Sequence, residues 1–467
     1  MSCPKLRYIL RLTGDQHKVL KKHLFPSDGF EAVAVALCGR RCGGSQHILS
    51  VHKLRLIPYE ACTTHTPVQV TWPTSLIVDL VAEAASKNMA ILKIHSHRGD
   101  FRFFSDVDDE ADSRLFPSLH GWTDDGLPHA SAVMLPDGKI FGRVVLDNNA
   151  FVSIDRVAVA GDNIIFFDEK ALELDEDEEQ IRTRQAFGAT TTQLLKALRI
   201  GIVGCSGTGS WVAEQLSRLG VGDLLLIDPD RVERKNLNRI VATSGEDAAQ
   251  NRYKVDALAS RLRNYGTGTN VHALARSALT YEAVYLLATC DIIFGCVDSI
   301  EGRDLLNRVA VFYSIPYFDL GVQLRGDGRG SVDTICGSVH FLVPDGSSLF
   351  SRGVYTSEML QAEALHRTNP ERYALEHKEG YIRGVMVESP AVISINGFCA
   401  TMAVNELLAR IHPFRNDPNS LFQWQQFDIV NSFWRSFSVG EKCPLLSRWT
   451  GRGDLIPLLN FNLIPAT

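Results

Sequence analysis

The sequence predicts an α/β protein of two domains, a mixed-sheet α+β domain followed by a doubly wound domain on a largely parallel sheet. Strand and helix patterns alternate over residues 6–155 and close with a hairpin turned at 136–138. Further along, the patterns alternate again, beginning with a glycine-rich turn between two apolar runs. An acidic stretch separates the two series. We therefore expect domains at 1–155 and 181–467, joined by an acidic linker at 156–180.

In the first domain, the strand patterns are LRYILRLT, EAVAVALCG, ILSVHKLRLIP, AILKIHSH and the hairpin HASAVMLPDGKIFGRVV. Helical patterns fall near 15–24, 76–85 and 105–115. In the second domain, YKVDALASRLRNY is an amphipathic helical pattern, and DIIFGCVDS is an apolar strand pattern. Alternation of this second kind is typical of a parallel sheet with helices on both faces, which binds ligands at the carboxyl ends of its strands.

Composition restricts the classes of function. At 467 residues the chain can bury more than one core. A net charge of −6 without a long basic block argues against nucleic acid as the main partner. No apolar run reaches the roughly 18 residues of a membrane span, and the N-terminal segment lacks a signal-peptide core. We expect no membrane partner and a cytoplasmic location, where the 10 cysteines, which form no CxxC pair, stay reduced.

The segment HSHRGDFRFFSDVDD predicts a metal site in the first domain. His95 and His97 lie two residues apart at the end of a strand, so their side chains share one side. Asp108 on the next segment completes three protein ligands, which leaves the fourth position of a zinc ion for water. Ser105 would lie beside that water and donate a hydrogen bond to a developing oxyanion.

The pattern H-x-H-x7-S-x2-D resembles the signature of the JAMM (JAB/MPN) metalloproteases without a mismatch. The resemblance implies Zn²⁺ and cleavage of peptide or isopeptide bonds after the C-termini of ubiquitin-like proteins. It also implies a glutamate from an earlier strand as general base, and Glu31 is the matching residue. Desolvation at the start of an apolar strand would raise the pKa of this carboxylate. An edge glutamate in water and a site that binds without cutting remain as alternatives. Arg98 stands where proline is frequent in this family.

A glycine-rich turn opens the second domain. The apolar run ending at Val203 meets Gly204, Gly207 and Gly209, a helical pattern follows, and a second apolar run ends at Asp228. Glycines let the backbone approach a phosphate, the helix N-terminus stabilises its charge, and the acid about 20 residues on holds a ribose hydroxyl. This signal alone fits a dinucleotide enzyme about as well as an ATP enzyme.

The residues after the turn favour ATP. They supply acids for a ribose and a metal ion, and two cations and an amide for a triphosphate, which hydride transfer does not need. These residues are Asp228, Asp230, Asn236, Arg239, Lys254 and Asp298. This series resembles the motifs of the ThiF/MoeB/HesA family, the bacterial relatives of ubiquitin-activating enzymes. The shared motifs are the glycine loop, DxD, NLxR, a distant lysine and a later aspartate, and the resemblance covers roughly 182–413.

This second resemblance implies a Rossmann-like fold that binds ATP and Mg²⁺. It implies that Arg239 and Lys254 neutralise the phosphates and that Asp298 holds Mg²⁺, all three in catalytic roles. It further implies that Arg184 reaches the nucleotide of the partner subunit in a homodimer formed through this domain.

Many members of this family carry two CxxC pairs that bind structural zinc and a cysteine that accepts the acyl group. The matching positions here read Ser348-Leu-Phe-Ser351 and Cys443-Pro-Leu-Leu, so we expect no zinc in the second domain. Cys336 is one candidate acceptor, either serine could accept the group as an ester, and Cys443 is a further candidate. We favour direct transfer to a partner's nucleophile without a covalent intermediate.

Together the two resemblances imply a bifunctional enzyme of a bacterial ubiquitin-like conjugation system. One half would adenylate the C-terminus of a ubiquitin-like protein, and the other would cleave after the same modifier. A conjugating-enzyme-like protein is the implied third partner. The alternative is activation and trimming of a sulfur-carrier protein in a biosynthetic pathway. A scaffold with dead sites is disfavoured because both sets of residues are complete.

Overall fold

The computed structural model describes residues 6–169, 178–326, 329–378 and 391–464. The chain forms two compact units. The first consists of Met1–Ala171, Val311–Ser314 and Arg448–Asn460, and the second contains the remaining residues. Within the described residues, no helix is long and apolar enough to cross a membrane.

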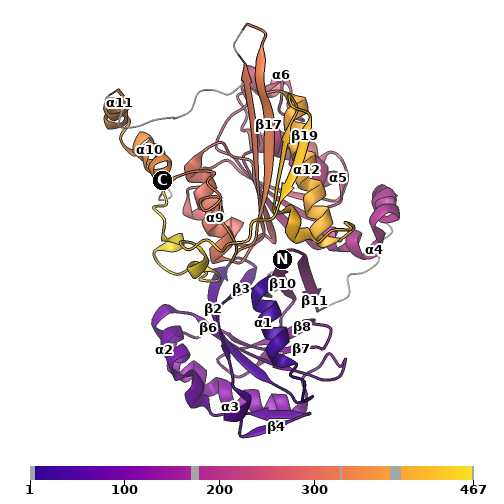
Figure 1. Ribbon diagram of the computed structural model, residues 1–467, viewed down its shortest axis with the longest axis vertical. Coiled ribbons are helices and arrows are strands. Elements are labelled where there is room, and N and C mark those ends of the chain that lie inside the picture. The colour runs from indigo at the N-terminus through magenta and orange to yellow at the C-terminus, as the bar shows by residue number, and fades with distance from the viewer. Residues whose placement is uncertain (1–5, 170–177, 327–328, 379–390, 465–467) are drawn as a thin grey trace. The chain divides into compact units, whose positions relative to one another are not determined.

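The first unit is built on a mixed nine-stranded sheet with the order β11-β10-β1-β3-β2-β6-β7-β8-β9 (Figure 1). Its strands are β1 (Arg7–Thr13), β2 (Val33–Gly43), β3 (Gln46–Leu56), β6 (Ala90–Ser96), β7 (His129–Met134), β8 (Ile140–Val145), β9 (Phe151–Ser153), β10 (Arg156–Ala160) and β11 (Ile164–Asp168). A separate hairpin contains β4 (Thr64–Thr66) and β5 (Gln69–Thr71). The helices are α1 (Gly14–Leu24), α2 (Val78–Lys87) and α3 (Asp106–Thr123).

Apolar side chains alternate along the central strands and fill a core on each face of this sheet. Helix α1 packs into one core through Leu20 and Leu24. Helices α2 and α3 close the other through residues such as Leu80 and Phe116. The mixed sheet flanked by helices that the sequence predicts is therefore confirmed.

The first sheet extends past residue 155. Strand β10 pairs in parallel with β1, and Arg156 forms an ion pair with Asp168, so much of the expected linker is part of the sheet. Residues 170–177 of that linker lie outside the described residues. A segment near the C-terminus also belongs to this unit, because the Gly39 N–H donates to the carbonyl oxygen of Gly451 at 3.0 Å.

The second unit is built on an eight-stranded sheet with the order β14-β13-β12-β15-β16-β17-β18-β19. Its strands are β12 (Arg199–Val203), β13 (Asp223–Ile227), β14 (Asn270–Leu274), β15 (Ile292–Gly295), β16 (Tyr317–Gly326), β17 (Val332–Leu342), β18 (Trp424–Asp428) and β19 (Phe433–Phe437). The helices are α4 (Ile181–Ala197), α5 (Gly207–Arg218), α6 (Gly245–Ala249), α7 (Lys254–Arg263), α8 (Tyr281–Leu287), α9 (Ile300–Phe312), α10 (Ser357–Thr368), α11 (Pro370–Lys378) and α12 (Ile393–Ile411).

The strand order of the second unit defines where a ligand can bind. Strands β14, β13, β12, β15 and β16 are parallel, and β17, β18 and β19 continue the sheet in antiparallel fashion. The chain runs from β12 outward to β14 and returns to β15 on the other side of β12. In parallel sheets, such a reversal opens a ligand-binding crevice at the carboxyl ends of the two strands.

Candidate functional site

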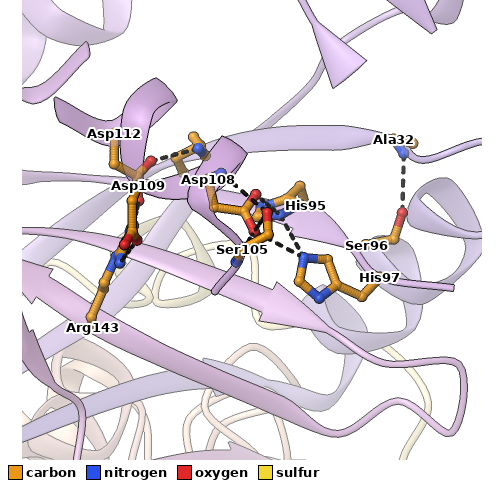
Figure 2. Close-up of polar contacts among 10 residues, drawn as sticks. Ala32, His95, Ser96, His97, Ser105, Asp108, Asp109, Asp112 and Arg143 are labelled. Carbon is orange, nitrogen blue, oxygen red and sulfur yellow. Dashed lines mark hydrogen bonds and ion pairs between the residues drawn. The ribbon is translucent and has the colours of Figure 1, made fainter. Parts of the chain in front are cut away.

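Strand register brings three expected site residues of the first unit to one face of its sheet. Strands β2 and β6 are antiparallel, with Val33 opposite His95. The register continues beyond the strand, because the Ala32 N–H donates to the Ser96 hydroxyl at 3.0 Å and the Ser96 N–H donates to the Ala32 carbonyl at 3.1 Å (Figure 2). One residue further, Glu31 falls opposite His97. Since alternate residues of a strand share a face, both histidines and Glu31 lie on the same face.

A helix start supplies the third metal-binding side chain. Ser105 caps α3, and its hydroxyl accepts a hydrogen bond from the Asp108 N–H at 3.2 Å. In return, the Ser105 N–H donates to Asp108 Oδ2 at 2.8 Å, which completes a capping box. This cap holds Asp108 in the first turn of the helix, beside the two imidazoles of β6.

The expected ligand atoms converge in the structure. The Nε2 atom of His95 lies 2.8 Å from Asp108 Oδ1, and the Nε2 atom of His97 lies 3.2 Å from Asp108 Oδ2. The two imidazole Nε2 atoms are 3.2 Å apart. Figure 2 shows these three side chains meeting, with Ser105 joined to them through its hydroxyl, which donates to Asp108 Oδ2 at 2.7 Å. Such a donor set of imidazoles and a carboxylate suits zinc.

Burial and hydrogen bonds shift the pKa values of His95, Asp108 and Glu31. Burial lowers the pKa of His95, which favours the neutral imidazole that a metal requires. For Asp108, burial would raise the pKa, but hydrogen bonds with His95 and His97 outweigh it and hold the pKa well below its usual range. Glu31 is 8% exposed, and its burial raises its pKa to about 7, with Asp108 adding to the rise and His97 and Arg98 opposing it. The expectation of a raised pKa at Glu31 is confirmed.

A buried ion network beneath α3, which the sequence reasoning missed, fixes the helix that carries Asp108. Asp112 is fully buried and pairs with Lys93 of β6 and with Arg143 of β8, whose Nη2 lies 2.7 Å from Asp112 Oδ2. Arg143 also pairs with Asp109 (Figure 2). Two signals in the sequence could have revealed this network. Lys93 is a charged residue in an otherwise apolar strand, and α3 carries several acids on one face.

We expect Asp112→Ala to destabilise the first unit by about 3 to 5 kcal/mol, because it removes the buried carboxylate that pairs with both Lys93 and Arg143. Denaturant unfolding, with hydrogen exchange of peptides from β6 and α3, measures the effect. The control is Glu110→Ala on the same helix, since Glu110 is exposed and pairs with exposed Arg114. Equal stability of the two variants would contradict the role assigned to the network.

In the second unit, the glycine turn lies at the carboxyl end of β12, the strand at which the strand order reverses. Gly204 has a φ of 86°, and a Cβ there would stand 2.5 Å from the carbonyl oxygen of Cys296. A Cβ on Gly209 would stand 1.8 Å from the Gly204 oxygen, and one on Gly207 would stand 2.4 Å from Asn396 Nδ2. Close packing therefore demands all three expected glycines. Helix α5 begins at Gly207, so its N-terminus faces the same turn.

Asp228 is joined to the glycine turn. Its Oδ2 accepts a hydrogen bond from the Cys205 N–H at 2.7 Å, and its Oδ1 accepts one from the Asp230 N–H at 2.8 Å. Burial raises the pKa of Asp228, and the nearby Lys254 ammonium opposes the rise. Lys254 is itself buried and its Nζ lies 2.7 Å from Asp230 Oδ2. The structure thus brings together the glycine turn, both acids of the DxD motif and the distant lysine.

The other expected residues of the nucleotide site each have different local contacts. Asn236 is buried and its side-chain oxygen accepts a hydrogen bond from the Glu233 N–H at 2.9 Å. Half-buried Arg239 donates to the Lys235 carbonyl at 3.0 Å. Asp298 is exposed and lies beyond β15, which ends at Gly295 rather than at Asp298 as the sequence predicts. Arg184 lies on α4, ahead of a break in the helix at Gly188, where φ is 80°.

At the positions where relatives carry CxxC pairs, Ser348 and Cys443 are buried and Ser351 is exposed. The Ser348 N–H donates to the Ser351 hydroxyl at 2.9 Å, and the Ser351 N–H donates to the Ser348 hydroxyl at 3.1 Å. Ser348 is 1% exposed and Cys443 is fully buried, so an ester on Ser348 or a thioester on Cys443 does not fit this conformation. Cys336 on β17 is half-buried, and burial followed by Asp428 raises its thiol pKa, which disfavours the nucleophilic thiolate.

Comparison with known proteins bears on the second unit. The sequence profile of the ThiF family matches residues 178–446. Over 146 residues the chain is 35% identical to an adenylyltransferase and sulfurtransferase MOCS3 of Caenorhabditis briggsae, covering 31% of this chain and 36% of that protein. Over 252 residues it is 25% identical to a ubiquitin-like modifier-activating enzyme 5 of Drosophila ananassae, covering 49% of this chain and 61% of that protein. The chain thus spans less than two thirds of either relative.

Among solved structures, the crystal structure of E. coli MccB with succinimide is similar to this chain. The aligned part covers 59% of this chain and 75% of the MccB chain. Its sequence is 19% identical, and the TM-score is 0.43. A likeness of this size is too weak to bear on function.

Proposed function

Because the chain belongs to the ThiF family, we propose that its second unit uses ATP to adenylate the C-terminus of a ubiquitin-like protein. The observation that carries this proposal is the junction of the glycine turn with Asp228 through the Cys205 N–H. It places a helix N-terminus and a buried carboxylate at the same end of β12, as binding of phosphates and of a ribose requires.

The residues of this site then divide the work of positioning and charge neutralisation. The glycine turn and the N-terminus of α5 hold the phosphates, while Arg239 and Lys254 neutralise them. Lys254 exchanges its partner Asp230 for a phosphate oxygen when ATP binds. Asp298 would hold Mg²⁺, which neutralises charge on the phosphates when bound. The carboxylate of the partner attacks the α-phosphate, the bond to pyrophosphate breaks, and an acyl-adenylate forms.

For the first unit, we propose a JAMM-type zinc-dependent peptidase that cleaves peptide or isopeptide bonds after the same modifier. The convergence of His95, His97 and Asp108 supports this, because two imidazoles and a carboxylate offer ligand atoms that all lie within 4.8 Å of one another. Zinc bound there would polarise the scissile carbonyl and lower the pKa of a bound water. Glu31 accepts the proton of the attacking water and returns it to the leaving amine, and Ser105 donates to the oxyanion.

The test of adenylation is ATP–pyrophosphate exchange by the purified chain. We expect exchange only when a ubiquitin-like protein with a free C-terminal carboxylate is present. The same protein with its C-terminal carboxylate blocked as an amide is the control. Exchange without any acceptor carboxylate, or none with any ubiquitin-like protein tried, would contradict the proposal.

A second candidate function is activation of a sulfur-carrier protein, because the 146-residue match at 35% identity is to a protein named adenylyltransferase and sulfurtransferase. The two functions differ in product. Transfer from the adenylate to a sulfur donor gives a thiocarboxylate, whereas transfer through a conjugating-enzyme-like partner gives an isopeptide conjugate. Intact-mass measurement of the modifier after the reaction separates them.

We also propose that Arg184 acts across the interface of a homodimer. Arg184→Ala and Asp298→Ala would each be inactive alone, but a mixed dimer would contain one complete site. Because mixing gives mixed dimers in about half of the population, we expect about a quarter of wild-type exchange. The control mixture replaces Asp298→Ala with the Arg184→Ala/Asp298→Ala double variant, which leaves no complete site. A monomeric active protein would contradict this proposal.

A further inference from the structure

Asp298 stands on a short loop between β15 and α9, and this loop is tied at both ends. At its start, the Cys296 N–H donates to the carbonyl oxygen of Val203 in β12 at 2.8 Å. At its end, the Ser299 hydroxyl accepts a hydrogen bond from the Gly302 N–H at 3.2 Å and so caps α9. The exposed Asp298 lies between these two ties.

One side chain supports the middle of the loop. Arg303, in the first turns of α9, folds back so that its Nε donates to the carbonyl oxygen of Val297 at 3.4 Å. Its backbone N–H donates to the Ser299 carbonyl at 3.2 Å. The side chain and the main chain of one residue therefore hold the loop on both sides of Asp298.

Arg303 is in turn held from the sheet. Its Nε lies 3.6 Å from Asp319 Oδ1 on β16, and Asp319 is 1% exposed. The Tyr317 hydroxyl donates to the same carboxylate oxygen at 2.8 Å. The guanidinium packs tightly beside Gly321, because a Cβ there would stand 3.1 Å from Arg303 Nη2. Asp319 first, and more weakly Asp298, raise the pKa of Arg303, so both carboxylates lie within its electrostatic reach.

We propose that Arg303, fixed by Asp319, is a positioning residue that holds Asp298 where it binds the magnesium ion of MgATP. This inference rests on the proposed adenylation function. A buried ion pair is weak evidence for stability, because desolvation offsets its attraction. A role in fixing geometry accounts for a charged pair placed behind the loop that carries a metal ligand. Removing a side chain that orients a metal ligand typically weakens metal binding or activity by about 10- to 100-fold.

The experiment compares Arg303→Met with wild type in ATP–pyrophosphate exchange across a Mg²⁺ titration. We expect the Mg²⁺ concentration for half-maximal exchange to rise by about tenfold or more, with a lower kcat and an unchanged KM for the ubiquitin-like protein. Arg303→Lys, which keeps the charge, should recover part of the loss. Asp319→Asn should shift the Mg²⁺ dependence in the same direction, and it carries the test if Arg303→Met does not fold.

The matched control is Arg308→Met. Arg308 lies on the same helix, its side chain is 19% exposed against 20% for Arg303, and its Nε pairs with Asp304 at 2.7 Å. This ion pair joins Arg308 to the helix itself and not to the Asp298 loop. We expect its Mg²⁺ dependence to match wild type. An equal shift in Arg308→Met, or no shift in Arg303→Met, would overturn the proposal.

Binding of ATP with and without Mg²⁺, measured by calorimetry, separates the two levels of inference. If wild type binds MgATP but shows no exchange, the proposed adenylation fails. The positioning role is then still judged by whether Arg303→Met loses the gain in ATP affinity that Mg²⁺ provides. If that gain is the same in Arg303→Met and wild type, the positioning role fails while adenylation can stand.

Discussion

Asp298→Ala should abolish the exchange of pyrophosphate into ATP that depends on a ubiquitin-like protein, and should leave peptide cleavage at its wild-type rate. Asp298 follows the carboxyl end of β15, which lies beside β12 where the strand order reverses. Charge stabilisation by a metal ion is worth several kcal/mol, and each step of about 1.4 kcal/mol is tenfold in rate. We therefore expect a loss of at least about a hundredfold.

Two further variants sharpen this prediction. Asp298→Asn keeps the shape of the side chain but removes its charge, and should lose nearly as much activity as the alanine variant. Asp333→Ala, which changes an exposed acid on β17, should behave as wild type. Exchange that survives Asp298→Ala would contradict the adenylation proposal.

His97→Ala should abolish both zinc binding and peptide cleavage while exchange continues unchanged. The change removes one of three ligands whose atoms lie within 4.8 Å of one another, so the remaining two cannot hold the ion tightly. Metal analysis of the purified chain should find about one zinc per wild-type chain. A chelator should stop cleavage, and added zinc should restore it.

The comparison with Glu31→Gln distinguishes a ligand from a general base. This variant should keep its zinc and lose cleavage, because Glu31 is proposed to move a proton and not to hold the metal. General acid–base catalysis contributes about 100- to 10,000-fold, which sets the expected loss. His272→Ala, an exposed histidine of the second unit, is the control. Two zincs per chain would contradict the expectation that the second domain binds none, and cleavage by metal-free protein would contradict the peptidase proposal.

Local patterns were sufficient where the chemistry lies within one strand, turn or helix start. The alternation of a strand puts His95 and His97 on one side, and the cap of α3 explains why Ser105 and Asp108 are three residues apart. The spacing of glycines predicted the turn after β12, and each glycine proves to lie where a Cβ would collide. For the histidine pair, the capping box and the contact of Gly209 with Gly204, the constraint acts between residues close in sequence, so the sequence alone expresses it. The contacts of Gly204 with Cys296 and of Gly207 with Asn396 join distant segments, and only the fold shows them.

The domain limits could not be predicted in the same way. Strands β10 and β11 complete the first sheet, and residues 448–460 belong to the same unit although they follow the second sheet in sequence. In the sequence, β10 and β11 are short apolar runs beside an acidic stretch, which is typical of a linker. In the structure, β10 pairs with β1 and β11 pairs with β10. The pairing of β10 with β1 is a contact between distant segments, and no local period reports it.

The sequence by itself determined the two sets of candidate residues, because metal ligands, capping boxes and phosphate-binding turns depend on residue type and short spacing. Only the tertiary structure decided how those residues are supported. It placed Glu31 opposite His97 through strand register, Asp112 between Lys93 and Arg143, and Asp319 behind Arg303. The physical reason is that a buried charge is stable only beside a partner, and the fold, not the distance along the chain, selects that partner.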